Sequence, residues 1–349
     1  MSRSPLRRSL ATPVLLGLIL VAFALVAWAV GSKPFNQTII DIFLKVIFAV
    51  GLWVFIGNSG VISFGHIAFA CLGGYVAAWT TIKPMMKGIS MPGLPDWLMQ
   101  TEIPYWAAAA VGAGWAALWA LIFGAVLMRL SGIAASIATF AMLAMVNSIY
   151  SNWDSVTAAT SSVVGIPIVR SVWPYLIAAI LAVVLGWAYG TSRHGLALRA
   201  ARDEPTAAAA SGVNIPRMRL IAFVVSGAIM GMGGALYAHS IGIVTPDTFY
   251  LGLTFITLSM LVVGGMGSLS GAVLGVLFLS SLIQGLRWLE AGVQVGTSTF
   301  ALPGGVQEIA LGAVMILILM FRPAGIMGNR ELTLPRAGSD TPGRSGPTN

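Results

Sequence analysis

The polar residues that could bind a small solute lie mainly in one glycine-rich segment, GNSGVISFGHIAFACLGGYVAAW, at residues 57–79. Asn58, Ser59, Ser63 and His66 supply amide, hydroxyl and imidazole groups there. Glycines permit close helix approach or a broken helix at membrane depth, where unwound backbone can hold a polar or zwitterionic solute. The segment therefore predicts part of a path for such a solute. In the alternative interpretation the glycines only pack helices, and for His66 alone a structural role is favoured.

A second polar group follows one face of the predicted span 132–151. Ser136, Thr139 and Asn147, with Gly132, fall within a narrow arc at 100° per residue. Polar groups on a membrane helix usually face protein or a water-filled path. Lining of a path and simple hydrogen bonding between helices remain equal alternatives here.

Two opposite charges stand inside the second apolar run. Asp41 and Lys45 have i, i+4 spacing, so their side chains lie one above the other on a helix and can pair. A lone charge at the bilayer centre costs about 2.5–3.5 kcal/mol, so we expect the pair to form. Its predicted role is structural, because a proton relay would need more ionisable groups. Glu308, near the start of the last apolar run, has no assigned role.

A polar island interrupts the apolar runs at residues 193–219, RHGLALRAARDEPTAAAASGVNIPRMR, and holds five arginines. Glu204 precedes Pro205, which suits the first position of a helix, and Gly212 suits the left-handed stop before Pro216. The pattern predicts a two-turn helix of roughly 10 Å with a small alanine face that a partner protein can contact. The alternative is an ordinary basic loop.

Bulk composition requires lipid as the solvent for much of this chain. It has 349 residues, of which 57% are hydrophobic and 9% charged, against about 25% charged in soluble domains. The net charge of +8 is explained by membrane topology, because no basic cluster is interleaved with aromatic residues as in nucleic-acid binding. Cys71 is the single cysteine and suits packing. No phosphate loop, HExxH motif, metal-ligand spacing or catalytic triad is present, so we predict no catalysis, metal or cofactor in this chain.

The apolar runs predict an all-α polytopic membrane protein with about ten spans (eight to ten) and both termini in the cytoplasm. Thirteen of the nineteen Lys and Arg residues then fall on the inner side, as the positive-inside rule requires. The predicted regions are a cytoplasmic N-terminus at 1–11, a membrane domain at 12–328 with a cytoplasmic loop at 192–219, and a disordered tail at 329–349. The spans are predicted at 12–31, 38–57, 60–81, 104–128, 132–151, 171–191, 219–239, 252–266, 269–287 and 304–321, of which the third and eighth are the weakest.

Four blocks of sequence resemble the permease subunits of branched-chain amino acid ABC importers, in the LivM-like branch. They are GNSGVISFGHIAFACLGGY, ALRAARDEPTAAAASGVNIPRMRLIAFVVSGAIMGMGGALYA, TPDTFYLGLTFITLSMLVVGGMGSLSGAVLG and LILMFRPAGIMG, within residues 57–328. In such families a cytoplasmic AAxxxG element is the coupling helix seated on an ATPase, and here it matches Ala207, Ala208 and Gly212. With their neighbours, the implied coupling residues are Arg202, Asp203, Glu204, Pro205, Ala207, Ala208 and Gly212.

The resemblance implies a machine in the bacterial inner membrane, surrounded by lipid. It would comprise this permease, a second homologous permease, two ATPase subunits that bind ATP, and a periplasmic binding protein. One segment departs from the family pattern TGG…G…GIP, because residues 157–167 read TAATSSVVGIP. The solute therefore stays open among branched-chain amino acids, urea, amides and aromatic acids. The competing classes are an autonomous secondary transporter, which the sparse ionisable groups disfavour, and a membrane-embedded enzyme.

Overall fold

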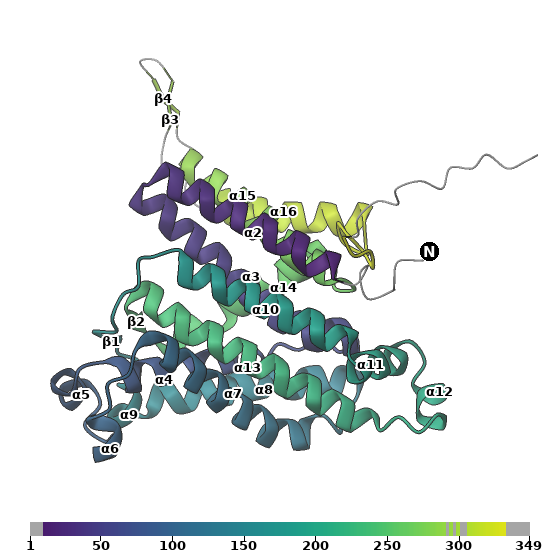
Figure 1. Cartoon of the computed structure of the whole chain (residues 1–349), viewed down its shortest axis with the longest axis horizontal. Helices are drawn as coiled ribbons and strands as arrows, with labels where there is room; N and C mark the ends of the chain where they lie inside the picture. The colour runs from purple at the N-terminus through teal and green to yellow at the C-terminus, as the bar shows by residue number, and fades with distance from the viewer. Residues whose placement is uncertain (1–9, 291–292, 296–297, 301–305, 333–349) are drawn as a thin grey trace, which may run out of the picture.

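The computed structural model describes residues 10–290, 293–295, 298–300 and 306–332, which form a bundle of long helices (Figure 1). The helices are α2 (Ala11–Val30), α3 (Lys33–Ser59), α4 (Ile67–Thr81), α5 (Pro84–Ser90), α6 (Asp96–Met99), α7 (Tyr105–Leu127), α8 (Gly132–Asn152), α9 (Asp154–Thr157), α10 (Trp173–Thr191), α11 (Arg193–Asp203), α12 (Pro205–Ala210), α13 (Ile215–Ile241), η1 (Pro246–Phe249, a 3-10 turn), α14 (Leu251–Gly264), α15 (Leu269–Glu290) and α16 (Val306–Phe321). Two short antiparallel pairs join β1 (Val163–Val164) to β2 (Ile243–Val244) and β3 (Val293–Val295) to β4 (Ser298–Phe300).

The predicted fold class is confirmed. A helix lies in each of the ten predicted spans, and eight segments of the described residues are long and apolar enough to cross a membrane. The helices α4 and α16 are shorter, with 15 and 16 residues. The chain is an all-α polytopic membrane protein.

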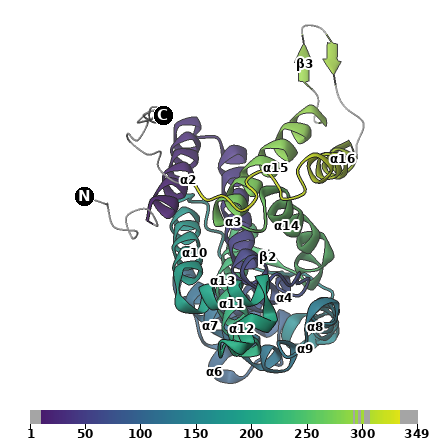
Figure 2. The ribbon, with the colours of Figure 1, turned by 90° about the vertical axis from the view of Figure 1, so that its right-hand side faces the viewer.

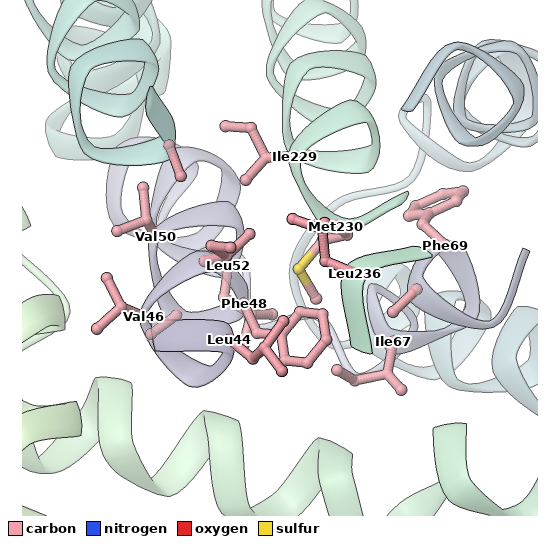
Figure 3. Packing of buried hydrophobic residues seen from close by; sticks show 14 of the residues in the cluster. Leu44, Val46, Phe48, Val50, Leu52, Ile67, Phe69, Ile229, Met230 and Leu236 are labelled. Atoms are coloured by element: carbon pink, nitrogen blue, oxygen red, sulfur yellow. The ribbon is translucent and has the colours of Figure 1, made fainter. Parts of the chain in front are cut away.

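Helix α3 lies at the centre of the bundle. In its most apolar stretch 89% of the residues are buried, against 28% in α2 at the periphery. Figure 3 shows Phe48 and Leu52 of α3 near Met230 of α13, with Phe69 of α4 on the other side. Lipid tails are as apolar as leucine, so this close packing rather than the hydrophobic effect must hold the helices together.

Glycines let the backbones of α4, α7 and α13 approach closely. A Cβ atom added at Gly234 of α13 would collide with the carbonyl oxygen of Ala70 in α4. A Cβ atom at Gly73 of α4 would likewise meet the carbonyl oxygen of Gly231. The run GMGG in α13 therefore serves contact between helices, as small residues commonly do in membranes.

The connections between helices gather at two opposite ends of the bundle (Figure 1). One end, called the α12 end below, carries α11, α12 and the short turn between α7 and α8. Arg219 donates a hydrogen bond to the Leu130 carbonyl oxygen in that turn. The other, the α5 end, carries α5, α6, α9 and the β1–β2 pair. The connections alternate between the two ends, as expected if the chain crosses the membrane at the predicted spans in order.

Two predicted boundaries are wrong. The third span begins at Ile67 rather than at residue 60, because Gly60 (φ 71°) ends α3 in the left-handed region and residues 60–66 are irregular. The predicted tail starts at least four residues too early. Glu331 accepts hydrogen bonds from the backbone N–H groups of Leu269 (2.7 Å) and Ser270 (3.0 Å), so it caps the positive N-terminal end of α15 and orders the segment. Residues 333–349 lie outside the described residues.

Candidate functional site

The predicted short helix of the polar island is present as α12, and local capping defines both of its ends. The Glu204 carboxylate accepts a hydrogen bond from the Thr206 N–H (3.3 Å), and Pro205 begins the helix. Gly212 adopts φ 86°, and its N–H donates to the Ala209 carbonyl oxygen (3.0 Å). The Val213 N–H donates to the Ala208 carbonyl oxygen (3.0 Å), which completes a Schellman motif. Six residues give a length of about 9 Å.

The orientation of α12 corrects one detail of the predicted contact face. Ala208 is only 5% exposed and packs within the chain, whereas Pro205 and Ala207 are exposed. Ala209 and Ala210 are exposed as well, so the surface available to a partner is the opposite side of the helix from Ala208. Figure 2 shows α12 beside α11. A charge introduced at Ala208 would therefore disturb the internal packing of the loop.

Arg202 ties the polar island to the central helix. Its Nη1 atom donates to the carbonyl oxygen of Gly57 near the C-terminal end of α3 (2.7 Å), and its Nε atom pairs with Asp203 (3.0 Å). A Cβ atom at Gly60 would lie 2.6 Å from Cγ of Arg202, so the side chain lies against the turn that ends α3. A cation is favourable at this position because the C-terminal end of a helix carries partial negative charge.

Arg199, which the sequence analysis did not single out, makes the second link. Its Nη2 atom donates to the Gly190 carbonyl oxygen of α10 (2.7 Å), and Nη1 donates to Oδ1 of Asn58 (3.4 Å). Burial and then the neighbouring Arg202 charge lower the pKa of Arg199, and an arginine stays protonated nonetheless. The sequence pattern that could have indicated Arg199 is its i, i+3 spacing from Arg202, which puts both side chains on one face of α11.

A cationic hollow lies beside α12 at the same end. It has a volume of about 440 Å³ and is lined by Arg193, His194 and Arg217 together with Gly212 and Asn214. Asn214 caps α13 by accepting a hydrogen bond from the Arg217 N–H (3.1 Å). The exposed part of the α12 end therefore combines a small apolar helix with positive charge.

The predicted path residues of the glycine-rich segment are buried and bonded inside the chain. Asn58 donates to the Val54 carbonyl oxygen (3.0 Å), and Ser59 accepts a hydrogen bond from the Val61 N–H (3.2 Å). Oγ of Ser63 lies 2.7 Å from Nδ1 of His66. The His66 ring contacts Phe55, Phe69 and Phe223, with centroids 5.0–6.0 Å apart. These contacts are those of the structural alternative, and a role in transport stays a prediction.

The polar face of α8 divides into two parts. Ser136 donates to the Ile62 carbonyl oxygen (2.6 Å), which ties α8 to the irregular segment 60–66, whereas Thr139 donates within α8 to the carbonyl oxygen of Ser136 (2.9 Å). Asn147 lies eight residues further along, about 12 Å from Thr139. Among the described residues nothing accepts a hydrogen bond from its buried amide nitrogen. Among the seven predicted path residues, the described part of the chain leaves two buried side-chain nitrogens without a hydrogen-bond partner, Nδ2 of Asn147 and Nε2 of His66.

Asp41 and Lys45 form the predicted ion pair, with Oδ2 and Nζ 2.6 Å apart. The pair also lines a cavity of about 690 Å³, which the sequence analysis did not predict. Gln284 and Arg287 of α15 reach the same cavity. The side chain of Glu308 lies outside the described residues.

The segment that departs from the family pattern contains backbone strain. Ala158 (φ 57°) and Ala159 (φ 49°) stand in the left-handed region, where an L-residue other than glycine costs about 1–2 kcal/mol. Both alanines occupy positions where glycine was expected from the resemblance. Replacing either with glycine should therefore raise the stability of the detergent-solubilised protein by about 1 kcal/mol, measured as a higher thermal midpoint.

The matched control for this prediction is Ala141→Gly, at an exposed position inside α8, which should lower stability by about 1 kcal/mol. If Ala158→Gly and Ala141→Gly lower the midpoint equally, the left-handed conformation at residue 158 is refuted.

The family description "Branched-chain amino acid transport system / permease component" matches residues 35–319, which is most of the chain. This chain belongs to that permease family. The match covers nearly all of α3 through most of α16 and so includes α11, α12 and, apart from Pro34, the residues that line the 690 Å³ cavity. Family membership thus applies to the α12 end and to the membrane bundle alike.

Individual permeases of the family are similar to this chain at low identity. LivH of Salmonella typhimurium is 30% identical over 162 residues, covering 46% of this chain and 47% of LivH. LivM of Escherichia coli K12 is 24% identical over 318 residues, covering 81% of this chain and 68% of LivM. BraD of Pseudomonas aeruginosa is 28% identical over 142 residues, 40% of this chain and 42% of BraD. The matches thus span about half the length of LivH and BraD. No solved structure matches the chain.

Proposed function

We propose that this chain is a membrane-spanning permease subunit of an ATP-binding-cassette importer for branched-chain amino acids. The observation that carries the proposal is the α12 end in a chain of the permease family. There an exposed, doubly capped helix is joined by Arg202 and Arg199 to the ends of α3 and α10. An ordinary basic loop would need neither the caps nor these anchors.

The proposed partners are two ATPase subunits, a second homologous permease and a periplasmic binding protein. ATP binds in the ATPase subunits, and this chain performs no catalysis. The α12 end then faces the cytoplasm, and the α5 end faces the periplasm across the bacterial inner membrane. This orientation follows the excess of basic residues at the α12 end.

In this proposal α12 receives the movement of the ATPase, and α11 transmits it. The contact from Arg202 to Gly57 reaches the last turn of α3, and the contact from Arg199 to Gly190 reaches the last turn of α10. Charge-assisted hydrogen bonds of this kind are about twice as strong as neutral ones. A displacement of α11 would thus shift the two helix ends together rather than bend the loop alone.

The test is transport by the complete complex, purified through this chain from its native membrane and reconstituted in liposomes. The proposal expects an ATPase and a second permease to co-purify. It also expects leucine uptake that requires both ATP and the binding protein. Uptake driven by an ion gradient without ATP would instead support an autonomous secondary transporter. Competition by urea, amides or aromatic acids, with none by leucine, would assign the importer to another solute.

A further inference from the structure

The 690 Å³ cavity extends from the α5 end toward the middle of the bundle. Its wall is made by the helix ends of α3, α13, α14 and α15 at the α5 end and by Thr248 of η1. Lys45 is the lining residue of α3 that lies furthest from this end. It follows the start of the helix by twelve residues, or about 18 Å, in a helix about 40 Å long. The inner end of the cavity is therefore near the middle of the membrane, where transporters commonly bind their solutes.

The charges of the cavity come from two different helices. Asp41 and Lys45 face it from α3, and Gln284 and Arg287, one turn apart, face it from α15. The Asp41 side chain is 38% exposed and that of Lys45 13% exposed, so the ion pair lies on the cavity wall rather than inside the packing of helices. Both signs of charge therefore line the same cavity.

The ion pair retains hydrogen-bonding capacity for a ligand. An ammonium group has three donors, and among the described residues the Lys45 ammonium uses one of them, for Oδ2 of Asp41. The second carboxylate oxygen of Asp41 can still accept hydrogen bonds. A purely structural ion pair could be buried between helices, whereas this pair lies beside an open volume.

We propose that this cavity holds the transported amino acid as a zwitterion, and this inference rests on the proposed function. The α-ammonium group of the solute would bind to Asp41, and the α-carboxylate to Lys45 and Arg287. Leu253 and Ile256 of α14 form an apolar part of the wall that a branched aliphatic side chain could contact. The volume lies within the range of about 300–1,000 Å³ that is typical of small-molecule sites.

A charge swap, Asp41→Lys combined with Lys45→Asp, distinguishes a solute-binding role of the ion pair from a purely structural one. The swapped variant keeps an i, i+4 ion pair at the same depth, so a purely structural pair should survive with a change of only a few tenths of a kcal/mol. A zwitterion bound in one orientation would meet like charges. We expect leucine uptake by the reconstituted complex to fall at least about tenfold, with unchanged membrane levels and unchanged co-purification of the partner subunits.

Thiol labelling gives a second readout that does not depend on transport. Cys71 is buried, so an Ile256→Cys variant presents one cavity-facing thiol to a membrane-impermeant maleimide. Leucine at millimolar concentration should slow this labelling at least about threefold. Isovalerate and isoamylamine, which each lack one of the two charges, should slow it less. The control is Met85→Cys on exposed α5, whose labelling leucine should leave unchanged.

The outcomes distinguish this inference from the proposed function. A wild-type complex that takes up no branched-chain amino acid overturns the proposed function. A wild-type complex that takes up leucine, with a swapped variant that transports equally well, overturns the cavity proposal. Labelling of Ile256→Cys at a rate that leucine does not change overturns it too.

Discussion

Replacing Ala207 with glutamate should lower solute uptake at least about tenfold while the chain still inserts in the membrane. Ala207 is exposed on α12, so the substitution leaves the internal packing of the loop intact. A carboxylate forced into an apolar protein contact costs several kcal/mol unless it is paired, and each 1.4 kcal/mol is a factor of ten in affinity. The measurement is leucine uptake and ATP hydrolysis by the reconstituted complex, normalised to permease content.

Ala207→Ser is the matched control, because it keeps the residue small and uncharged. Met85→Glu places the same charge at the α5 end, where Met85 is exposed. Both controls should transport within about twofold of the wild type. Normal uptake by Ala207→Glu would show that α12 is no contact for the ATPase.

Gly212→Pro should also lower solute uptake, because ATP hydrolysis would no longer be coupled to transport. Proline cannot adopt the φ of 86° found at Gly212, and it lacks the N–H that donates to Ala209. The C-terminal end of α12 must therefore rearrange, although the membrane helices are untouched. Gly212→Ala retains the N–H and adds only about 1–2 kcal/mol of backbone strain, so it should have the smaller effect.

Replacing Gly234 with valine should prevent accumulation of the folded protein. The first added carbon already collides with the backbone of Ala70, which cannot move away as a side chain can. Overpacking commonly costs about 1–3 kcal/mol, and here two whole helices must separate, so we expect a loss at the upper end or beyond. The measurement is the amount of monodisperse protein extracted in detergent, together with its thermal midpoint.

Gly114→Val is the matched control for this substitution. Gly114 lies on α7, and a Cβ atom there would meet nothing within 4 Å. This variant should be extracted in near wild-type amounts. Equal loss of both variants would mean that valine harms any glycine position in this bundle, and the close α4–α13 contact would be refuted.

Local features explain why much of the fold and α12 could be predicted from the sequence. Spans follow from long apolar runs, because each membrane helix must satisfy its own backbone. The α12 helix followed from Glu204, Pro205 and Gly212, since capping involves residues only a few positions apart. The Asp41–Lys45 pair was predictable for the same reason.

Contacts between distant segments were not predictable in this way. The burial of Ala208 and the reach of Arg202 to Gly57 depend on how α11 packs beneath α3, which no local pattern specifies. The cavity needs α3 and α15 to face each other. The sequence therefore predicted the pairing of Asp41 with Lys45, but not that Asp41 and Arg287 line the same cavity. Glu331 was assigned to a disordered tail because its partners at the start of α15 are 61 and 62 residues away.

Site-specific cross-linking from α12 would show whether this helix contacts an ATPase subunit. The single native cysteine is buried, so Ala210→Cys can carry a photoreactive maleimide at one exposed position of α12. We expect an adduct, in the native membrane, with a protein that mass spectrometry identifies by its nucleotide-binding phosphate loop. Met85→Cys at the α5 end should give none. Absence of an ATPase adduct at residue 210, or equal adducts at both positions, would show that α12 is not the contact for the ATPase.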